Sequence, residues 1–113
     1  RHPNLKTASI EAGSDWVPTL VKKLKKAYAQ NPWAFATDPV QQLRDHLWVA
    51  PFYEDDIRVL ADTIGVDRVL FGSDYPHAEG LADPLAFVND LPGFSESEVR
   101  SIMSDNALAL LNG

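Results

Sequence analysis

One short segment of the sequence says most about the architecture: residues 69–77 read VLFGSDYPH. Its first four residues are uncharged, which is typical of a strand covered on both faces of a parallel sheet. The carboxylate of Asp74 follows, and after it come Tyr75-Pro76 and the imidazole of His77. In parallel α/β proteins, ligands bind where the strands end and the loops begin. We therefore expect a buried strand that ends at a binding site.

The rest of the sequence predicts two more β-α units. Strands are expected near residues 5–10, 47–51 and 68–72, and apolar residues at helical spacing occupy residues 17–28 and 57–64. Parallel strands joined by right-handed helical crossovers are the natural arrangement of such units. Because three parallel strands leave two open edges, we expect the chain to complete a larger sheet or to associate with its own copies.

Local signals mark where several helices begin and end. Asp38-Pro39 predicts a short helix that ends near His46, whose imidazole is expected to stabilise the last carbonyls. Gly65 is a C-cap candidate. The terminal helices are expected within residues 83–111, and Ser95-Glu96-Ser97-Glu98 has the pattern of a capping box.

Composition excludes several classes of protein. The chain has 113 residues, which suits one small domain, and it has no cysteine, so disulfides and thiolate metal sites are excluded. Its formal net charge of −6 disfavours binding to nucleic acid. It has no apolar run of about 18 residues and no cationic leader, so we expect no membrane partner and a cytoplasmic protein.

Two further features concern the first third of the chain. It begins Arg1-His2-Pro3 with no initiator methionine, which favours a piece of a longer protein, and His2 is expected to be exposed. Four lysines lie close together on the first predicted helix, and we interpret them as its solvated face; a patch for phosphate or an anionic membrane is the alternative. They are Lys22, Lys23, Lys25 and Lys26.

Asp74 is the first candidate for chemistry. A carboxylate at a strand end beside a divalent cation is able to bind the metal and to accept a proton from the metal-bound water, whose pKa the metal lowers toward about 7. The alternative is purely structural, because an aspartate before a turn such as Tyr75-Pro76 often caps that turn.

Glu11 and His77 are weaker candidates. Glu11 ends the first strand and could orient a cation or a substrate amine, or it could be a partnered carboxylate at a helix entrance. His77 could reach a metal, a substrate oxygen or the backbone, or it could be simply exposed. Glu79 is expected to be a solvated loop carboxylate. Other residues are aromatic and are expected to pack in the core or loops, with Trp33 and Tyr53 also candidates for a pocket wall: Trp16, Trp33, Phe35, Trp48, Phe52 and Tyr53.

Several common catalytic motifs are missing from the sequence. It has no glycine-rich phosphate loop, no His-Glu-x-x-His pair and no Gly-x-Ser-x-Gly elbow. Asp74, His77 and Glu11 do not by themselves make a three-ligand metal centre.

The sequence resembles the C-terminal end of metal-dependent amidohydrolases, in the amidohydrolase-2 branch related to aminocarboxymuconate-semialdehyde decarboxylase. Residues 71–77, 81–84 and 105–111 carry the resemblance, and residues 3–13 resemble the sixth barrel strand of that family. The resemblance implies that residues 1–113 are the C-terminal part of a single barrel domain. This part would be three β-α units of a (β/α)₈ TIM-like barrel, incomplete on its own.

The resemblance also implies a chemistry. Family members hold one divalent metal, often zinc, and they hydrolyse C–N, C–O or C–C bonds or decarboxylate small substrates. Asp74 matches the strand-eight aspartate that binds the metal or its water and moves the proton, and His77 matches a position that often carries histidine. The family's other metal-binding histidines would precede Arg1. Glu11 stands where many decarboxylase-like relatives have histidine, which weakens the case for decarboxylation here.

Three functional hypotheses follow. The first is a metal-dependent hydrolase of a small organic substrate, in which Asp74 is both metal ligand and catalytic base and Glu11 and His77 contact the substrate or the proton path. The second is a metal-dependent non-oxidative decarboxylase, and the third is a metal-free binding or assembly module in which Asp74 only caps a turn. Expected partners are the substrate, the missing N-terminal barrel portion and further copies of the chain. Residues 1–113 alone are expected to be inactive and to bind metal weakly.

Overall fold

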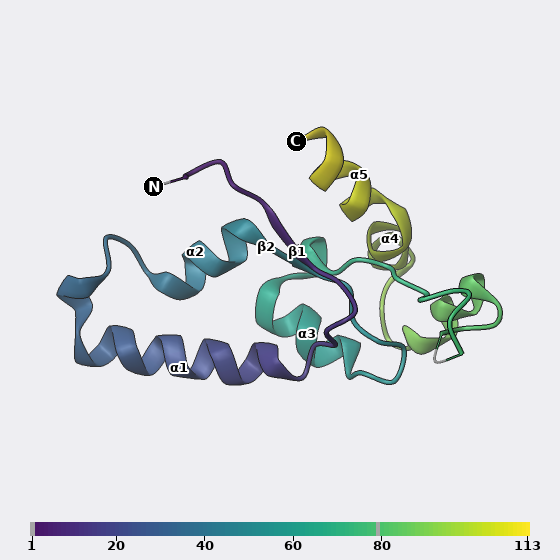
Figure 1. Ribbon diagram of the computed structural model, residues 1–113, viewed down its shortest axis with the longest axis horizontal. Coiled ribbons are helices and arrows are strands. Elements are labelled where there is room, and N and C mark those ends of the chain that lie inside the picture. Colours follow the sequence, from purple (N-terminus) through teal and green to yellow (C-terminus); the bar gives the residue numbers. More distant parts are fainter. Residues whose placement is uncertain (1, 79) are drawn as a thin grey trace.

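The computed structural model describes residues 2–78 and 80–113, so the expectation for Glu79 lies outside the described residues. The fold mixes helices with a small parallel sheet, and its longest dimension is 48 Å (Figure 1). The strands are β1 (Thr7–Ser9) and β2 (Leu47–Val49), and the α-helices are α1 (Trp16–Gln30), α2 (Pro39–His46), α3 (Ile57–Ile64), α4 (Glu96–Arg100) and α5 (Asn106–Asn112). Single 3₁₀ turns occupy Pro32–Ala34 and Val66–Arg68, and a longer 3₁₀ segment occupies Pro84–Asp90.

The sheet is parallel, as the sequence predicts. β1 pairs with β2 in a register that sets Thr7 opposite Leu47 and Ser9 opposite Val49. The third predicted strand is reduced to one bridge between Val49 and Val69, where the Leu70 amide donates to the Val49 carbonyl at 2.8 Å. The prediction of a full strand over residues 68–72 is therefore wrong in extent. The 3₁₀ turn Val66–Arg68 occupies the residues just before Val69, so the extended segment begins later than predicted. Within the described part of the chain, this segment pairs with a strand on one side only.

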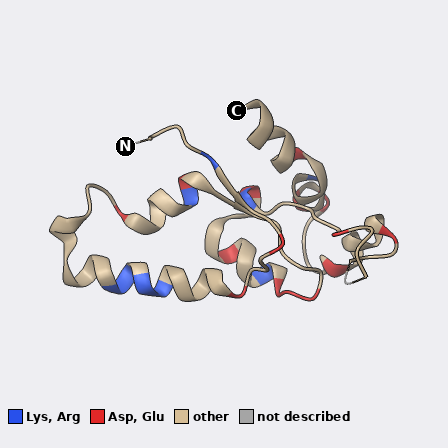
Figure 2. Ribbon diagram, viewed as in Figure 1, with Lys and Arg blue, Asp and Glu red and all other residues tan. Residues whose placement is uncertain are grey.

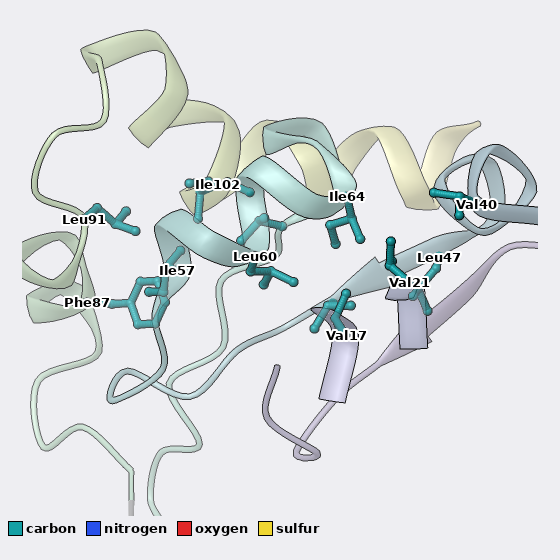
Figure 3. Packing of buried hydrophobic residues seen from close by; sticks show 13 residues of the cluster. Val17, Val21, Val40, Leu47, Ile57, Leu60, Ile64, Phe87, Leu91 and Ile102 are labelled. Carbon is teal, nitrogen blue, oxygen red and sulfur yellow. The ribbon is translucent and has the colours of Figure 1, made fainter. Parts of the chain in front are cut away.

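Side chains alternate across β2 and bury both of its faces. Val49 contributes to the main core. Val17 of α1 and Leu60 and Ile64 of α3 belong to the same cluster (Figure 3). Trp48 points to the opposite face, where it packs with Ala50 and Leu70. Burial on both faces is what a strand inside a parallel sheet requires.

β1 differs from β2 because it is mostly exposed. Thr7 and Ala8 are exposed, and so are the flanking Leu5 and Ile10. Apolar strand residues of this kind are normally buried. Among the described residues, β1 has a partner strand on one edge and an uncovered opposite edge, which agrees with the expectation that this sheet is incomplete.

The helix signals read from the sequence are largely confirmed. Asp38 caps α2 by accepting the Val40 amide at 2.9 Å, and Gly65 ends α3 with a φ of 100° that favours glycine. The capping box of α4 is present, with the Ser95 amide donating to Glu98 Oε1 at 2.9 Å. The four clustered lysines lie on the exposed side of α1 (Figure 2).

The last helical stretch is continuous from α4 to α5 through a π-helical segment, Ser101–Asp105. Asn106, which is buried, follows it. Its Nδ2 donates to the carbonyls of Val66 and Val69 at 2.7 and 2.8 Å. These bonds attach the C-terminal helix to the start of the third extended segment. Among the described residues, no helix is long and apolar enough to cross a membrane.

Candidate functional site

The three extended segments end around one small pocket. Its volume is about 110 Å³. It brings Glu11, which follows β1, together with Asp74, which follows the third segment, although 63 positions separate them in the sequence. The lining residues are Ile10, Glu11, Ala50, Pro51, Phe52, Gly72 and Asp74.

Asp74 lies at this pocket with its carboxylate largely shielded from solvent. Its side chain is 19% exposed. The turn that follows is capped by its neighbour, because the Tyr75 amide donates to Ser73 Oγ at 3.2 Å. The His77 amide donates to the Asp74 backbone carbonyl at 2.9 Å. In the described structure, the local turn is therefore built from the Ser73 side chain and the Asp74 main chain, and the Asp74 carboxylate accepts no amide of its own turn.

Glu11 and Asp74 share an unusual backbone conformation. Their φ angles are 62° and 55°, in the left-handed region that residues with side chains rarely adopt. Such conformations cost of the order of 1–3 kcal/mol each and are found mainly at functional sites. Two strained acidic residues, at the ends of the two segments that flank β2, therefore mark this pocket as the candidate site.

His77 does not line the pocket. Its side chain is 65% exposed, and its Nδ1 lies 3.9 Å from Asp74 Oδ1, which is beyond hydrogen-bond distance. The loop that carries it returns to the strand end, where the Leu81 amide donates to the Ser73 carbonyl at 3.0 Å. His77 thus lies at the rim of the site, beside the aspartate.

The loop returns closely because of Gly80. A Cβ atom at this position would lie 2.5 Å from the Asp74 carbonyl oxygen and 2.6 Å from that of Ser73. Glycine is the residue that permits such a close backbone approach. Gly80 thereby helps to fix the position of Asp74.

Phe52, which was expected to pack in the core or loops and which begins the loop after the second strand, lines the pocket. It directly follows the second strand segment and is 40% exposed. Its place immediately after a strand end was the signal available in the sequence. The two aromatic residues expected as pocket walls do not line this pocket. Trp33 lies on the α1–α2 connection and is 80% exposed, and Tyr53 packs against the main core.

Larger hollows do not coincide with these strand ends. One of about 880 Å³ lies between the segment before β1 and α2 and includes His2 and His46. His2 is exposed, as expected. The His46 Nδ1 donates to the Leu5 carbonyl at 2.7 Å, so this imidazole ties α2 to the segment before β1, whereas the sequence indicated bonds to its own helix.

The described residues contain no group of three or more His, Cys, Asp or Glu side chains placed to hold a metal ion. The residues present could supply one or two ligands of a metal site. Asp74 offers one shielded carboxylate oxygen donor at the pocket, with the imidazole of His77 beside it. Asp74 as a metal ligand is therefore a proposal, and within the described residues the further ligands that a complete site needs are absent.

The whole chain, residues 1–113, matches the amidohydrolase family. The chain belongs to this family. It is 25% identical over 116 residues to 2-amino-3-carboxymuconate-6-semialdehyde decarboxylase from Dictyostelium discoideum, a match that covers 98% of this chain and 32% of the relative. The crystal structure of an amidohydrolase from Mycobacterium avium subsp. paratuberculosis K-10 is 59% identical, with a TM-score of 0.94, and the match covers 98% of this chain and 29% of that one.

This amidohydrolase chain therefore spans about a third of the length of the two relatives. The TM-score of 0.94 means that the arrangement of helices and strands described above is that of the same part of a solved amidohydrolase. Members of the superfamily generally use a divalent metal, and the described residues of this chain do not by themselves form a complete donor set.

Proposed function

We propose that the intact protein is a metal-dependent hydrolase of a small organic substrate and that residues 1–113 are the last three β-α units of its barrel. The observation that carries the proposal is the position of Asp74. Its shielded carboxylate lies at a pocket where three strand segments end, and its own turn is capped by Ser73. Membership of the amidohydrolase family supports the reaction class.

Asp74 has two roles in this proposal. It contributes one oxygen ligand to a divalent metal, for which zinc is the candidate, and the remaining ligands come from the rest of the barrel. The metal would supply Lewis acidity and would lower the pKa of water toward about 7. The Asp74 carboxylate takes the proton from the water that attacks the substrate. Its shielding from solvent suits this role, because few waters compete for the carboxylate.

Glu11 and His77 have supporting roles in the proposal. Glu11 lines the same pocket as Asp74 and contacts the substrate there. His77, at 3.9 Å from the Asp74 carboxylate, lies on the solvent side and passes the proton outward or contacts a polar group of the substrate.

Substitution of Asp74 tests the reaction. In the intact protein, Asp74→Asn keeps the shape of the side chain and removes the base, so turnover should fall by several orders of magnitude. Asp62→Asn, at an exposed position on α3, is the matched control and should retain activity. Turnover of a panel of small amides and esters is the measurement. Near-normal activity of the Asp74 variant would rule out the proposed role.

Decarboxylation is the second candidate, and the printed name of the Dictyostelium relative favours it. The two reactions differ in their stoichiometry with water. Hydrolysis in ¹⁸O-labelled water incorporates the label into the organic product, whereas decarboxylation replaces the lost carboxylate by a proton, releases carbon dioxide and leaves the organic product unlabelled. The presence of Glu11 at the pocket leads us to expect label incorporation.

A metal-free binding or assembly module is the third hypothesis, and the intact protein would then contain no stoichiometric metal. We also propose that residues 1–113 pair with the rest of the barrel and that the intact protein forms homo-oligomers. Open strand edges are ready templates for pairing, which supports this proposal.

A further inference from the structure

We infer that Asn106 is a positioning residue for Asp74: its side-chain amide clamps the start of the third extended segment and thereby fixes where that segment ends. The inference rests on the proposed function, because it takes the Asp74 carboxylate as the group that acts at the pocket. It adds a residue of the C-terminal helix, which does not itself line the pocket, to those on which the reaction depends.

One peptide unit of the segment, between Val69 and Leu70, is bonded on both sides. The Leu70 N–H donates to the Val49 carbonyl of β2 at 2.8 Å, and the Val69 C=O accepts from Asn106 Nδ2 at 2.8 Å. The N–H and C=O of a trans peptide point in opposite directions, so Asn106 lies on the edge of the segment away from β2. There its side chain donates as the backbone of a neighbouring strand would.

Asparagine suits this position because its amide nitrogen carries two N–H donors. Asn106 Nδ2 also donates to the Val66 carbonyl at 2.7 Å, so one side chain joins the 3₁₀ turn to the extended segment that follows it. Asn106 is 5% exposed, and water therefore has little access to replace these bonds. A buried carbonyl that loses its donor destabilises that arrangement of the chain.

The π-helical segment before Asn106 brings its side chain to this place. The Asn106 amide donates to the carbonyl of Ser101, five residues back, whereas an α-helix bonds four residues back. One extra residue rotates the helix that follows by about 100°. Asn106 thus faces the third segment, while Ile102, one turn earlier, is fully buried in the main core (Figure 3). Such segments are frequent at functional sites.

The register of the third segment decides which of its side chains face the pocket. Side chains alternate along an extended chain. Leu70 packs on the Trp48 side of the sheet, and further along Gly72 and Asp74 line the pocket. A slip by one residue would exchange the two faces. Because the pairing with β2 is a single bridge in the described part of the chain, the bonds from Asn106 contribute a large share of this register.

The far end of the segment carries two amides that report its position. The Leu81 amide donates to the Ser73 carbonyl at 3.0 Å, and the His77 amide donates to the Asp74 carbonyl at 2.9 Å. Displacement of the segment at Val69 would move Ser73 and Asp74, and both amides would then lose their acceptors. Their exchange with solvent follows the position of Asp74 whether or not a metal is bound.

Hydrogen exchange of the intact protein, followed by mass spectrometry, tests the clamp. Asn106→Ala removes both donors, so peptides that contain the His77 and Leu81 amides should exchange about tenfold faster relative to α1. Ile102→Val is the matched control, because it loosens core packing in the same helical stretch and leaves both Asn106 bonds in place. It should change exchange in these peptides no more than in α1.

The affinity of the intact protein for zinc, measured by competition with a chelator, is the second test. Asn106→Ala should weaken zinc binding about tenfold, the lower end of the loss seen when residues that orient a ligand are removed. Ile102→Val should leave the affinity unchanged. Asn106→Ser keeps one donor on a shorter side chain and should give intermediate effects in both tests. Circular dichroism checks folding, and the serine variant decides the matter if the alanine variant does not fold.

The inference fails if loss of Asn106 speeds exchange only in the C-terminal helix, or equally in α1 and in the His77 and Leu81 peptides, or nowhere. Asn106 would then only anchor that helix. Unchanged zinc affinity in the Asn106 variants of a protein that binds zinc would also overturn it. The proposed function fails separately, if the intact wild type holds no metal and Asp74→Asn leaves turnover unchanged, and the exchange test still decides whether Asn106 places Asp74.

Discussion

At the scale of single residues, the site depends on how the backbone presents Asp74. Asp74 has a left-handed backbone conformation and lines the pocket, and the Ser73 hydroxyl caps the turn that follows. The strain of that conformation has to be offset by contacts elsewhere in the loop. The close return of the chain at Gly80 is the most evident of these contacts.

Gly80→Ala is predicted to disturb the site through this contact. The new Cβ would lie 2.5 Å from the Asp74 carbonyl oxygen, so the backbone has to move. We expect the free energy of unfolding of the intact protein to fall by about 1–3 kcal/mol, together with a loss of turnover. Urea denaturation and an activity assay measure the two effects.

Gly72→Ala is the control for stability, because its Cβ would contact Ala50 Cβ at an ordinary 3.4 Å. Equal stability losses in the two variants would contradict the account of Gly80.

At the scale of the elements, helix ends were readable from the sequence because their determinants are local. Asp38 bonds to an amide two residues away, and the Ser95–Glu98 capping box closes within one turn. The extent of the third strand depends on neighbours far away in the sequence, and for that reason the apolar run 69–72 predicted more strand than the structure contains.

The candidate site also has features that local sequence predicts and features that depend on distant contacts. The rule that ligands bind at strand ends pointed to the loops after the three segments, and residues at all three ends line one pocket. It could not tell that Phe52 would line the pocket while Trp33 and Tyr53 would not, because that outcome depends on the packing of Phe52 against Gly13 in another loop. His77 is placed at the rim by the return of its loop, which no local spacing encodes.

The capping box of α4 gives a pH prediction. The Ser95 backbone amide, which donates to the Glu98 carboxylate, is the main reason that the pKa of Glu98 lies below its ordinary value of 4.5. A carboxyl group with a lowered pKa stabilises the fold above its unfolded pKa. That stability is lost as the pH falls from about 4.5 through the lowered pKa.

Glu98→Gln keeps the capping pattern without a titrating group, so this part of the acid dependence should disappear from thermal unfolding curves. Glu96→Gln, at an exposed position on the same helix, should keep the wild-type dependence. The explanation is wrong if both variants keep it.

At the scale of the whole molecule, this chain spans about a third of the length of its two relatives, and its first strand is exposed. β1 carries exposed apolar neighbours on an edge without a partner among the described residues. We predict that residues 1–113, expressed alone, self-associate at micromolar concentration and show no turnover with added zinc. Sedimentation velocity and an activity assay test both points. A monomeric, active piece would contradict the proposal that the rest of the barrel completes the site.

The metal content of the intact protein tests the central claim most directly. Elemental analysis of the purified wild type should find one divalent metal per chain, and the Asp74→Asn variant should contain much less, while remaining folded by circular dichroism. Equal metal content in the two proteins, or none in the wild type, would contradict the assignment of Asp74 as a metal ligand.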